Sequence, residues 1–230
     1  MKFYAVVPGL LQRLVWFPTY FILLFFCRLE VRGREYVKNL PQNAIFASNH
    51  SCELDPILVN ALCPYFSRHV PLFYVSREKE FYAHMGWWRK HVYGSWFFTA
   101  WGAFSAPANL RDYRRALKIH LGILRDGNDL CIIPVWKAGP ERKTTRAKGG
   151  VAYLVRESNV PVIPVSIDGT EGMTVADFLL RRRTVVVTAG PPLYKKDLFK
   201  EDETPGDERS VCERAAAVIA EKIAALKIPE

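Results

Sequence analysis

Half of the 230 residues are hydrophobic and 13% are aromatic, which excludes a disordered chain. The 32 Lys and Arg residues outnumber the 23 Asp and Glu residues, and the resulting net charge of +9 favours an anionic partner: nucleic acid, a phospholipid surface or a phosphorylated substrate. The five cysteines lack CxxC spacing, which argues against a disulfide framework or a zinc site and fits a reducing compartment.

The N-terminal segment, residues 3–27, is apolar and rich in aromatic side chains, with Pro8 and Pro18 inside it. Its longest unbroken apolar run, residues 14–27, is shorter than the roughly 20 residues that span a bilayer. Interfacial aromatic residues and flanking basic residues favour two short helices lying in a membrane interface. The alternatives are a buried core helix and a single tilted span over the whole segment.

The rest of the chain alternates short apolar strands with helices. Strands are predicted at 29–33, 44–48, 72–76, 101–104, 129–134, 162–167 and 183–189, and helices at 56–62, 78–91, 109–126, 150–157 and 207–226. A basic loop is expected at 135–150 and a charged loop at 195–207. This order predicts an α/β fold with a mostly parallel central sheet flanked by helices. Two parts are expected: membrane-associated N-terminal helices at 1–28, and one α/β domain at 29–230.

A polar loop after the strand at 44–48 carries His50 and, five residues later, Asp55. Asp55 is predicted to be the N-cap of a helix with Pro56 at its first position. A carboxylate placed there can reach a ring nitrogen of His50, fix the tautomer and leave the other nitrogen to take a proton from a hydroxyl. The spacing alone is a weak signal, because the alternative is a simple helix cap beside a loop histidine.

In parallel sheets a ligand binds beyond the carboxyl ends of the strands, so the loops after Ser48, Phe104 and Pro134 form the candidate site.

The segment at 49–56, Asn-His-Ser-Cys-Glu-Leu-Asp-Pro, resembles the first motif of the glycerophospholipid acyltransferase family, which includes the lysophosphatidic acid (1-acyl-glycerol-3-phosphate) acyltransferases. Residues 31–35, 75–80, 148–150 and 160–165 resemble the family's entry strand, its second strand with the following turn, its third-motif helix start and its fourth motif. The resemblance covers about 30–193. It implies that His50 is the general base and Asp55 its orienter, with no metal and no bound cofactor.

Two motifs depart from the family's pattern. The second has Gly102 but lacks the arginine that binds the acceptor's phosphate, and Arg111 is the nearest candidate. The third has Val135 and Trp136 where the family has Glu and Gly. The basic loop offers replacement ligands for a phosphate, namely Lys137, Arg142, Arg146 and Lys148. The alternative is a solvated basic face attracted to anionic lipid.

The resemblance implies an O-acyltransferase that moves a fatty acyl group from acyl-CoA or acyl-carrier protein to the hydroxyl of a lysophospholipid-like acceptor. Such an enzyme would serve phospholipid biosynthesis on the cytoplasmic face of a membrane. Two alternatives stay open: an acyltransferase for an acceptor without phosphate, and a catalytically impaired relative that binds lipid. Nucleic acid is not an expected partner, because the sequence has no helix-turn-helix, zinc or aromatic RNP pattern.

Overall fold

The computed structural model describes residues 3–78, 96–107, 112–138, 144–199 and 207–228, and for residues 135–138 and 144–147 it describes the backbone only. Most of the helix expected at 78–91 lies outside the described residues, as do Arg111 and Arg142.

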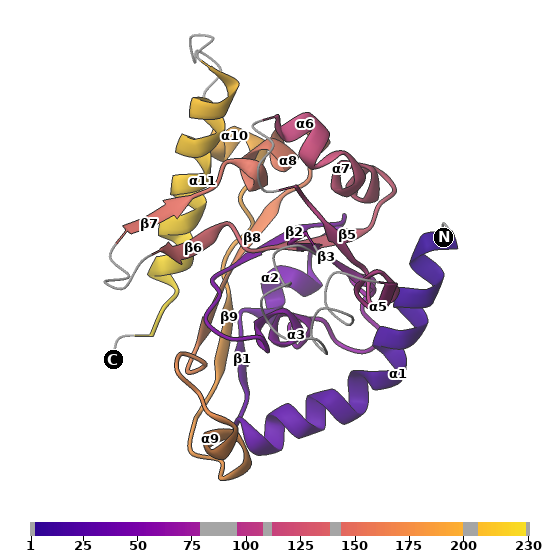
Figure 1. The fold of residues 1–230 in the computed structure, drawn as a ribbon, viewed down its shortest axis with the longest axis vertical. Coiled ribbons are helices and arrows are strands. Elements are labelled where there is room, and N and C mark those ends of the chain that lie inside the picture. Colours follow the sequence, from indigo (N-terminus) through magenta and orange to yellow (C-terminus); the bar gives the residue numbers. More distant parts are fainter. Residues whose placement is uncertain (1–2, 79–95, 108–111, 139–143, 200–206, 229–230) are drawn as a thin grey trace.

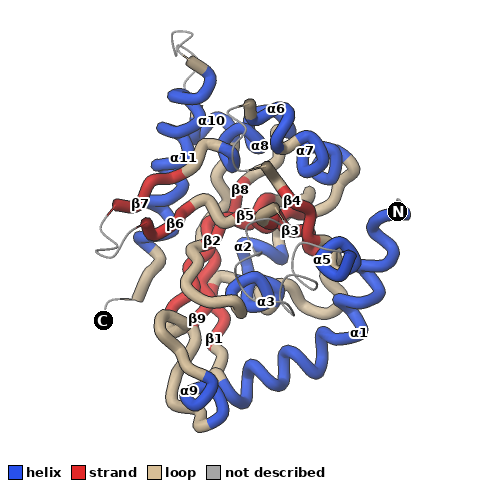
Figure 2. The backbone as a smooth tube through the Cα atoms, in the orientation of Figure 1, coloured by secondary structure: helices blue, strands red, loops and turns tan. Residues whose placement is uncertain are grey.

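The core of the domain is a seven-stranded sheet in the order β1-β9-β8-β2-β5-β3-β4 (Figures 1 and 2). The strands are β1 (Glu30–Arg32), β2 (Ile45–Ser48), β3 (Leu72–Ser76), β4 (Ala103–Ser105), β5 (Asp129–Ile132), β8 (Val162–Asp168) and β9 (Val186–Ala189). Every neighbouring pair is parallel except β8 and β9, so β9 and β1 run opposite to the others. The predicted α/β fold with a mostly parallel sheet is confirmed.

Helices cover both faces of this sheet (Figure 1). The helices of the described residues are α1 (Phe3–Phe26), α2 (Arg34–Lys38), α3 (Asp55–Asn60), α5 (Trp96–Ala100), α6 (Tyr113–Ala116), α7 (Lys118–Arg125), α8 (Gly150–Ser158), α9 (Val175–Leu179), α10 (Lys195–Leu198) and α11 (Glu208–Ala225). Ile45 and Ala47 of β2 pack with α7, α8 and α11, whereas Phe46 packs with α2, α3 and the end of α1. Alternate residues of the strand therefore fill two separate core layers, as expected for a strand buried on both faces.

Several elements differ from the sequence prediction. The basic loop contains an antiparallel hairpin, β6 (Val135–Ala138) and β7 (Thr144–Ala147), because its Val, Trp and Thr residues favour strands. The helix expected to run to residue 126 is broken at Leu117, which leaves the helical conformation and is buried. The charged loop begins with α10. Helices α2, α5 and α9 were not predicted, because five residues are too few to show a helical period.

The N-terminal segment forms one continuous helix, α1, instead of the two short helices that the sequence favoured. Pro8 and Pro18 lie inside it, and each removes one intrahelical hydrogen bond without ending the helix. The helix bends as it passes along the domain (Figure 1), and interior prolines are a usual cause of such bends.

The inner face of α1 is fixed to the domain by hydrogen bonds to main-chain groups. Gln12 donates from Nε2 to the carbonyl oxygens of Leu72 (2.8 Å) and Trp101 (3.0 Å). Its Oε1 accepts from the N–H of Leu72 (2.9 Å). Trp16 Nε1 donates to the carbonyl oxygen of Cys63 (3.0 Å). These contacts make α1 a packed part of the α/β domain.

The outer face of α1 carries an exposed apolar stripe. It consists of Phe3, Val6, Val7, Leu10, Leu14, Phe17, Phe21, Ile22, Leu24 and Phe25. By length and composition α1 could cross a membrane, and only a small part of its most apolar stretch is buried in the protein. The helix therefore presents one face to the domain and an apolar face outward.

Replacing Gln12 with Leu is expected to lower the free energy of unfolding by about 2 kcal/mol or more, because it leaves buried backbone groups of Leu72 and Trp101 without partners. Urea unfolding of the purified protein measures this. Leu14→Gln, on the exposed stripe, is the matched control and should change stability by less than about 0.5 kcal/mol. If α1 were a helix detached from the domain, Gln12→Leu would be neutral or stabilising.

Candidate active site

The carboxyl ends of β2, β3, β4 and β5 lie along one edge of the sheet and open into a cavity of about 900 Å³. The chain leaves β2 toward β3 on one side and leaves β5 toward β8 on the other, so the β2–β5 boundary is a topological switch point. All three loops predicted to form the site, those after Ser48, Phe104 and Pro134, contribute to the lining of the cavity, through His50, Ala106 and Lys148 among others.

The His50 and Asp55 side chains meet at this edge, with Nδ1 of His50 3.0 Å from Oδ2 of Asp55. The same oxygen accepts hydrogen bonds from the backbone N–H groups of Ser51 and Cys52. Asp55 is 1% exposed, whereas His50 is 31% exposed and lines the cavity. An acceptor at Nδ1 places the ring proton there and makes Nε2 the basic nitrogen. The contact predicted from the sequence is confirmed.

The expected capping role of Asp55 is wrong. Leu54 is the N-cap of α3, and Asp55 is the first helical residue. The N–H of Asp55 bonds to the carbonyl oxygen of Cys52 (3.1 Å), which turns the carboxylate back over the preceding loop. The side chain therefore satisfies loop amides at residues 51 and 52 instead of amides inside the helix.

Asn49 secures the other side of the loop. Its side-chain oxygen accepts from the N–H of Ile167 (2.7 Å), and its side-chain nitrogen donates to the carbonyl oxygen of Ile167 (2.8 Å). The amide thus continues the pairing of β2 with β8 beyond Ser48. This role of Asn49 could not be predicted from local spacing, because its partner lies 118 residues away.

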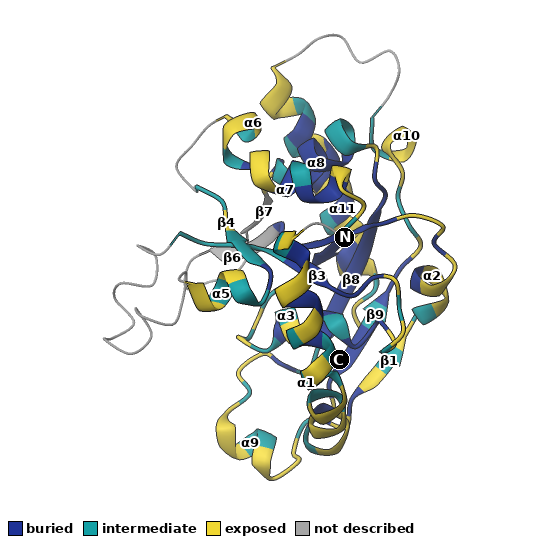
Figure 3. Cartoon of the chain, turned by 90° about the vertical axis from the view of Figure 1, so that its right-hand side faces the viewer, coloured by how far each residue is buried: buried dark blue, intermediate teal, exposed yellow. Residues whose placement is uncertain are grey.

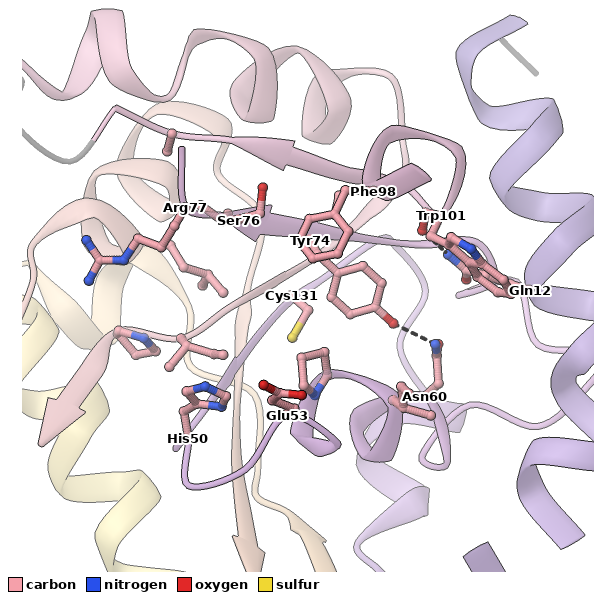
Figure 4. A pocket seen from close by; sticks show the side chains of 18 of the residues that line it. Gln12, His50, Glu53, Asn60, Tyr74, Ser76, Arg77, Phe98, Trp101 and Cys131 are labelled. Carbon is pink, nitrogen blue, oxygen red and sulfur yellow. Dashed lines mark hydrogen bonds between the residues drawn. The ribbon is translucent and has the colours of Figure 1, made fainter. Parts of the chain in front are cut away.

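Arg77 and Lys148 line the cavity with His50. Figure 4 shows Arg77 and His50 at one end of the pocket, with Gln12 and Trp101 at the other. Burial lowers the pKa of Lys148, and the charge of Arg77 lowers it further, so the two cations are close enough to interact. Lys148 was predicted as a site residue. Arg77 was missed, although its position directly after a predicted strand was a usable signal.

The cationic end also contains a carboxylate. Glu53 lines the cavity and lies beside His50 in Figure 4. A bound anion at this end would therefore meet both charge signs, with Arg77 and Lys148 supplying the positive one.

The other predicted ligands are placed differently. Gly102 lies in the turn before β4 with φ +86, and a Cβ there would lie 3.2 Å from the ring of Phe73. This is the amino end of the strand, so the position indicates a close-packed turn. Lys137 and Arg146 lie on the neighbouring strands β6 and β7, of which only the backbone is described. A ligand role for them, and for Arg111 and Arg142, stays a prediction.

Away from His50 the cavity is mostly apolar. Its walls include Val15, Trp16, Tyr20, Leu23, Phe97, Phe98 and Trp101 from α1, α5 and the residue after α5. A polar pair lies within it: Asn60 Nδ2 donates to the Tyr74 hydroxyl (2.6 Å; Figure 4), and burial raises the pKa of Tyr74, so the phenol stays neutral. A cavity that is cationic at one end and apolar along its length fits an amphiphile with an anionic headgroup.

Comparison with known proteins agrees with this geometry. A probable 1-acyl-sn-glycerol-3-phosphate acyltransferase from Mycoplasma pneumoniae is 23% identical over 153 residues, which are 63% of this chain and 53% of that protein. The chain thus spans about half the length of that curated relative. The crystal structure of the 1-acyl-sn-glycerophosphate (LPA) acyltransferase PlsC from Thermotoga maritima shares the fold, with a TM-score of 0.52 and 17% identity over 97% of this chain and 92% of the other.

The profile of the family described as Acyltransferase matches residues 28–168, which is more than half of the chain. These residues include the His50–Asp55 pair, Arg77, Lys148 and the four strands β2, β3, β4 and β5, whose carboxyl ends open into the cavity. The chain belongs to the acyltransferase family.

Proposed function

We propose that this protein is an O-acyltransferase that moves a fatty acyl group from acyl-CoA or acyl-carrier protein to the hydroxyl of a lysophospholipid-like acceptor, as a step of phospholipid biosynthesis. The observation that carries the proposal is the His50–Asp55 pair at the cationic end of an otherwise apolar cavity. Membership of the acyltransferase family supports the reaction class. The Mycoplasma and Thermotoga proteins are both named as acyltransferases for 1-acyl-glycerophosphates, which supports the acceptor class.

The proposed mechanism follows from the placement of one proton. Nε2 of His50 accepts the proton of the acceptor hydroxyl while the oxygen attacks the thioester carbonyl carbon. The C–O bond forms, the C–S bond breaks, and the imidazolium returns the proton to the departing thiolate, so that a free thiol leaves. The negative charge of Asp55 stabilises the imidazolium between these steps and holds the ring in the reactive orientation.

The acceptor's phosphate is assigned to Arg77 and Lys148. Arg77 lies at the His50 end of the cavity (Figure 4), and Lys148 lines the same cavity and interacts electrostatically with Arg77. A phosphate bound there would leave the hydroxyl of the same acceptor near His50. Charge-assisted hydrogen bonds to phosphate are among the stronger polar contacts in proteins. This pair would compensate for the missing second-motif arginine and for Val135 and Trp136 in the third motif.

The exposed stripe of α1 supports membrane association, with the opposite face of the helix forming a wall of the cavity. Trp16, Tyr20 and Leu23 line the cavity from the inside, so an acyl chain could enter from the bilayer beside α1. The five cysteines are free, which fits the reducing, cytoplasmic side of the membrane where acyl thioesters are available.

The first experiment is acyl transfer by the purified protein, with acyl-CoA or acyl-carrier protein as donor and a panel of lysolipids as acceptors. A phosphate-bearing lysolipid should be acylated, and His50→Ala should reduce the rate by at least about 100-fold because the general base is lost. A protein that binds lysolipid but yields no product dependent on His50 would be a lipid-binding relative instead.

Asp55→Asn tests the orienting charge. The amide keeps an acceptor for the loop N–H groups but loses the negative charge, so kcat should fall on the order of 10²- to 10⁴-fold while the thermal midpoint changes little. Asp197→Asn is the matched control, because that carboxylate accepts a backbone hydrogen bond at α10, remote from the cavity, and should leave kcat unchanged. Unaltered turnover in Asp55→Asn would show that Asp55 holds the loop in place but does not contribute to the reaction.

Arg77→Gln and Lys148→Gln test the phosphate site. Each should lower kcat/KM about 10- to 100-fold for a phosphate-bearing acceptor and much less for the matching monoacylglycerol, because a charged hydrogen bond is lost only in the first case. Lys118→Gln and Arg125→Gln, exposed on α7, are controls of equal charge change. Equal losses with both acceptors would indicate general surface attraction rather than a phosphate site.

A further inference from the structure

The connection between β8 and β9 is longer than the sheet requires. Asp168 and Val186 are paired at the ends of these antiparallel strands, so a two-residue turn could join them. The chain instead inserts residues 169–185, here called the β8–β9 arm, which carries α9 beyond the carboxyl end of β8. This is the same edge of the sheet that carries the candidate active site.

The β8–β9 arm is ordered by its own hydrogen bonds. The Thr174 hydroxyl accepts from the N–H of Asp177 (3.1 Å), and the Asp177 carboxylate accepts from the N–H of Thr174 (3.0 Å), which closes a capping box at the start of α9. Two main-chain hydrogen bonds close the last turn of α9. The N–H of Arg182 donates to the carbonyl oxygen of Asp177, and the N–H of Arg181 donates to the carbonyl oxygen of Phe178.

An arginine occupies the position at which such helix ends usually have glycine. Arg181 has φ 56, in the left-handed region that is unfavourable for residues with a side chain. Its Nε donates to the carbonyl oxygen of Phe25 (2.9 Å), and its guanidinium lies 4.1 Å from the centroid of the Phe25 ring. The ring of Phe178 stacks on the ring of Phe26, with 5.1 Å between the ring centroids. The arm is therefore docked on the last turn of α1.

Apolar side chains of the arm remain outside this contact. Val175 is 76% exposed, Leu179 57% and Leu180 60%. Figures 1 and 3 show α9 beside the end of α1, with much of both elements exposed. Arg181 holds the arm against Phe25, which belongs to the exposed stripe of α1, so the two exposed apolar surfaces lie on elements that contact each other.

The charge of the arm is predominantly positive next to these apolar residues. Arg181, Arg182 and Arg183 follow Leu180 directly, against Glu171 and Asp177. Arg182 lies 3.9 Å from Asp177 and its side chain is largely exposed. Leucines followed by arginines match the two layers of a bilayer surface, apolar chains below and anionic phosphates above.

We propose that the β8–β9 arm is a second contact with an anionic lipid bilayer, in which Leu179 and Leu180 enter the acyl layer and Arg182 and Arg183 bind lipid phosphates. The proposal rests on the membrane association proposed for α1. A single helix lying on a bilayer leaves the domain able to roll about the helix axis. A second contact off that axis fixes the roll, and with it the direction in which the cavity faces the membrane.

The test is co-sedimentation of the full chain with phosphatidylcholine vesicles, with and without phosphatidylglycerol. Leu179→Ser with Leu180→Ser should weaken binding to both kinds of vesicle by about tenfold or more, since buried apolar area is lost. Arg182→Gln with Arg183→Gln should weaken binding about tenfold on anionic vesicles only, with a smaller effect at high salt. Lys118→Gln with Arg125→Gln is the control of equal charge change, and thermal unfolding checks that each variant folds.

Three outcomes would overturn the proposal. In the first, both arm variants bind like the unaltered protein while Leu14→Ser with Phe17→Ser abolishes binding, which assigns the bilayer contact to α1 alone. In the second, the leucine variant alters self-association measured by light scattering and leaves vesicle binding unchanged, so that a second copy covers the arm. In the third, the unaltered protein binds neither vesicle. Acyl transfer to a detergent-dissolved acceptor, measured on the same samples, shows separately whether the catalytic proposal stands.

Discussion

The site depends on one buried carboxylate oxygen. Oδ2 of Asp55 receives hydrogen bonds from His50, Ser51 and Cys52 in a position that is almost closed to solvent. A buried carboxylate without partners is strongly unfavourable, so the loop can satisfy the charge only by staying wrapped around it. The hydrogen bond from Nδ1 to this oxygen also fixes the orientation of the His50 ring, and with it the position of the basic nitrogen Nε2.

Two further sets of hydrogen bonds attach the loop and the opposite wall of the cavity to the sheet. Asn49 binds the main chain of β8, and β2 pairs with both β5 and β8 in the middle of the sheet. The loop therefore begins at the central strand of the sheet, which is hydrogen-bonded on both sides. On the far side of the cavity, Gln12 binds main-chain groups of β3 and of the turn before β4. The loop that carries His50 and Asp55 and the apolar wall of the cavity are thus held by the same sheet from opposite sides.

The α/β architecture and the His50–Asp55 contact were predictable, because both follow from local patterns: alternating strands and helices, and a strand end followed by a short loop. Asn49 was less accessible, since its partner Ile167 lies on a strand that is distant in sequence. Arg77 directly follows a predicted strand and could have been found from that position. The hairpin of β6 and β7 was not predicted, because its basic residues suggested a loop. Each strand is also too short to show a clear alternation of apolar and polar residues. The sequence favoured two short helices over the single helix α1, because Pro8 and Pro18 usually interrupt a helix. The contacts that hold α1 on the domain leave no local pattern in the sequence.

The position of Gln12 has a practical consequence for anyone who shortens the chain. Removing an apolar N-terminal helix is a common way to obtain a more soluble form of a lipid enzyme. Here the same helix supplies Trp16, Tyr20 and Leu23 to the interior and satisfies the backbone of Leu72. A truncated protein would keep His50 and Asp55 yet lose one apolar wall of the cavity. Solubility would then be obtained together with an altered cavity and a destabilised strand β3.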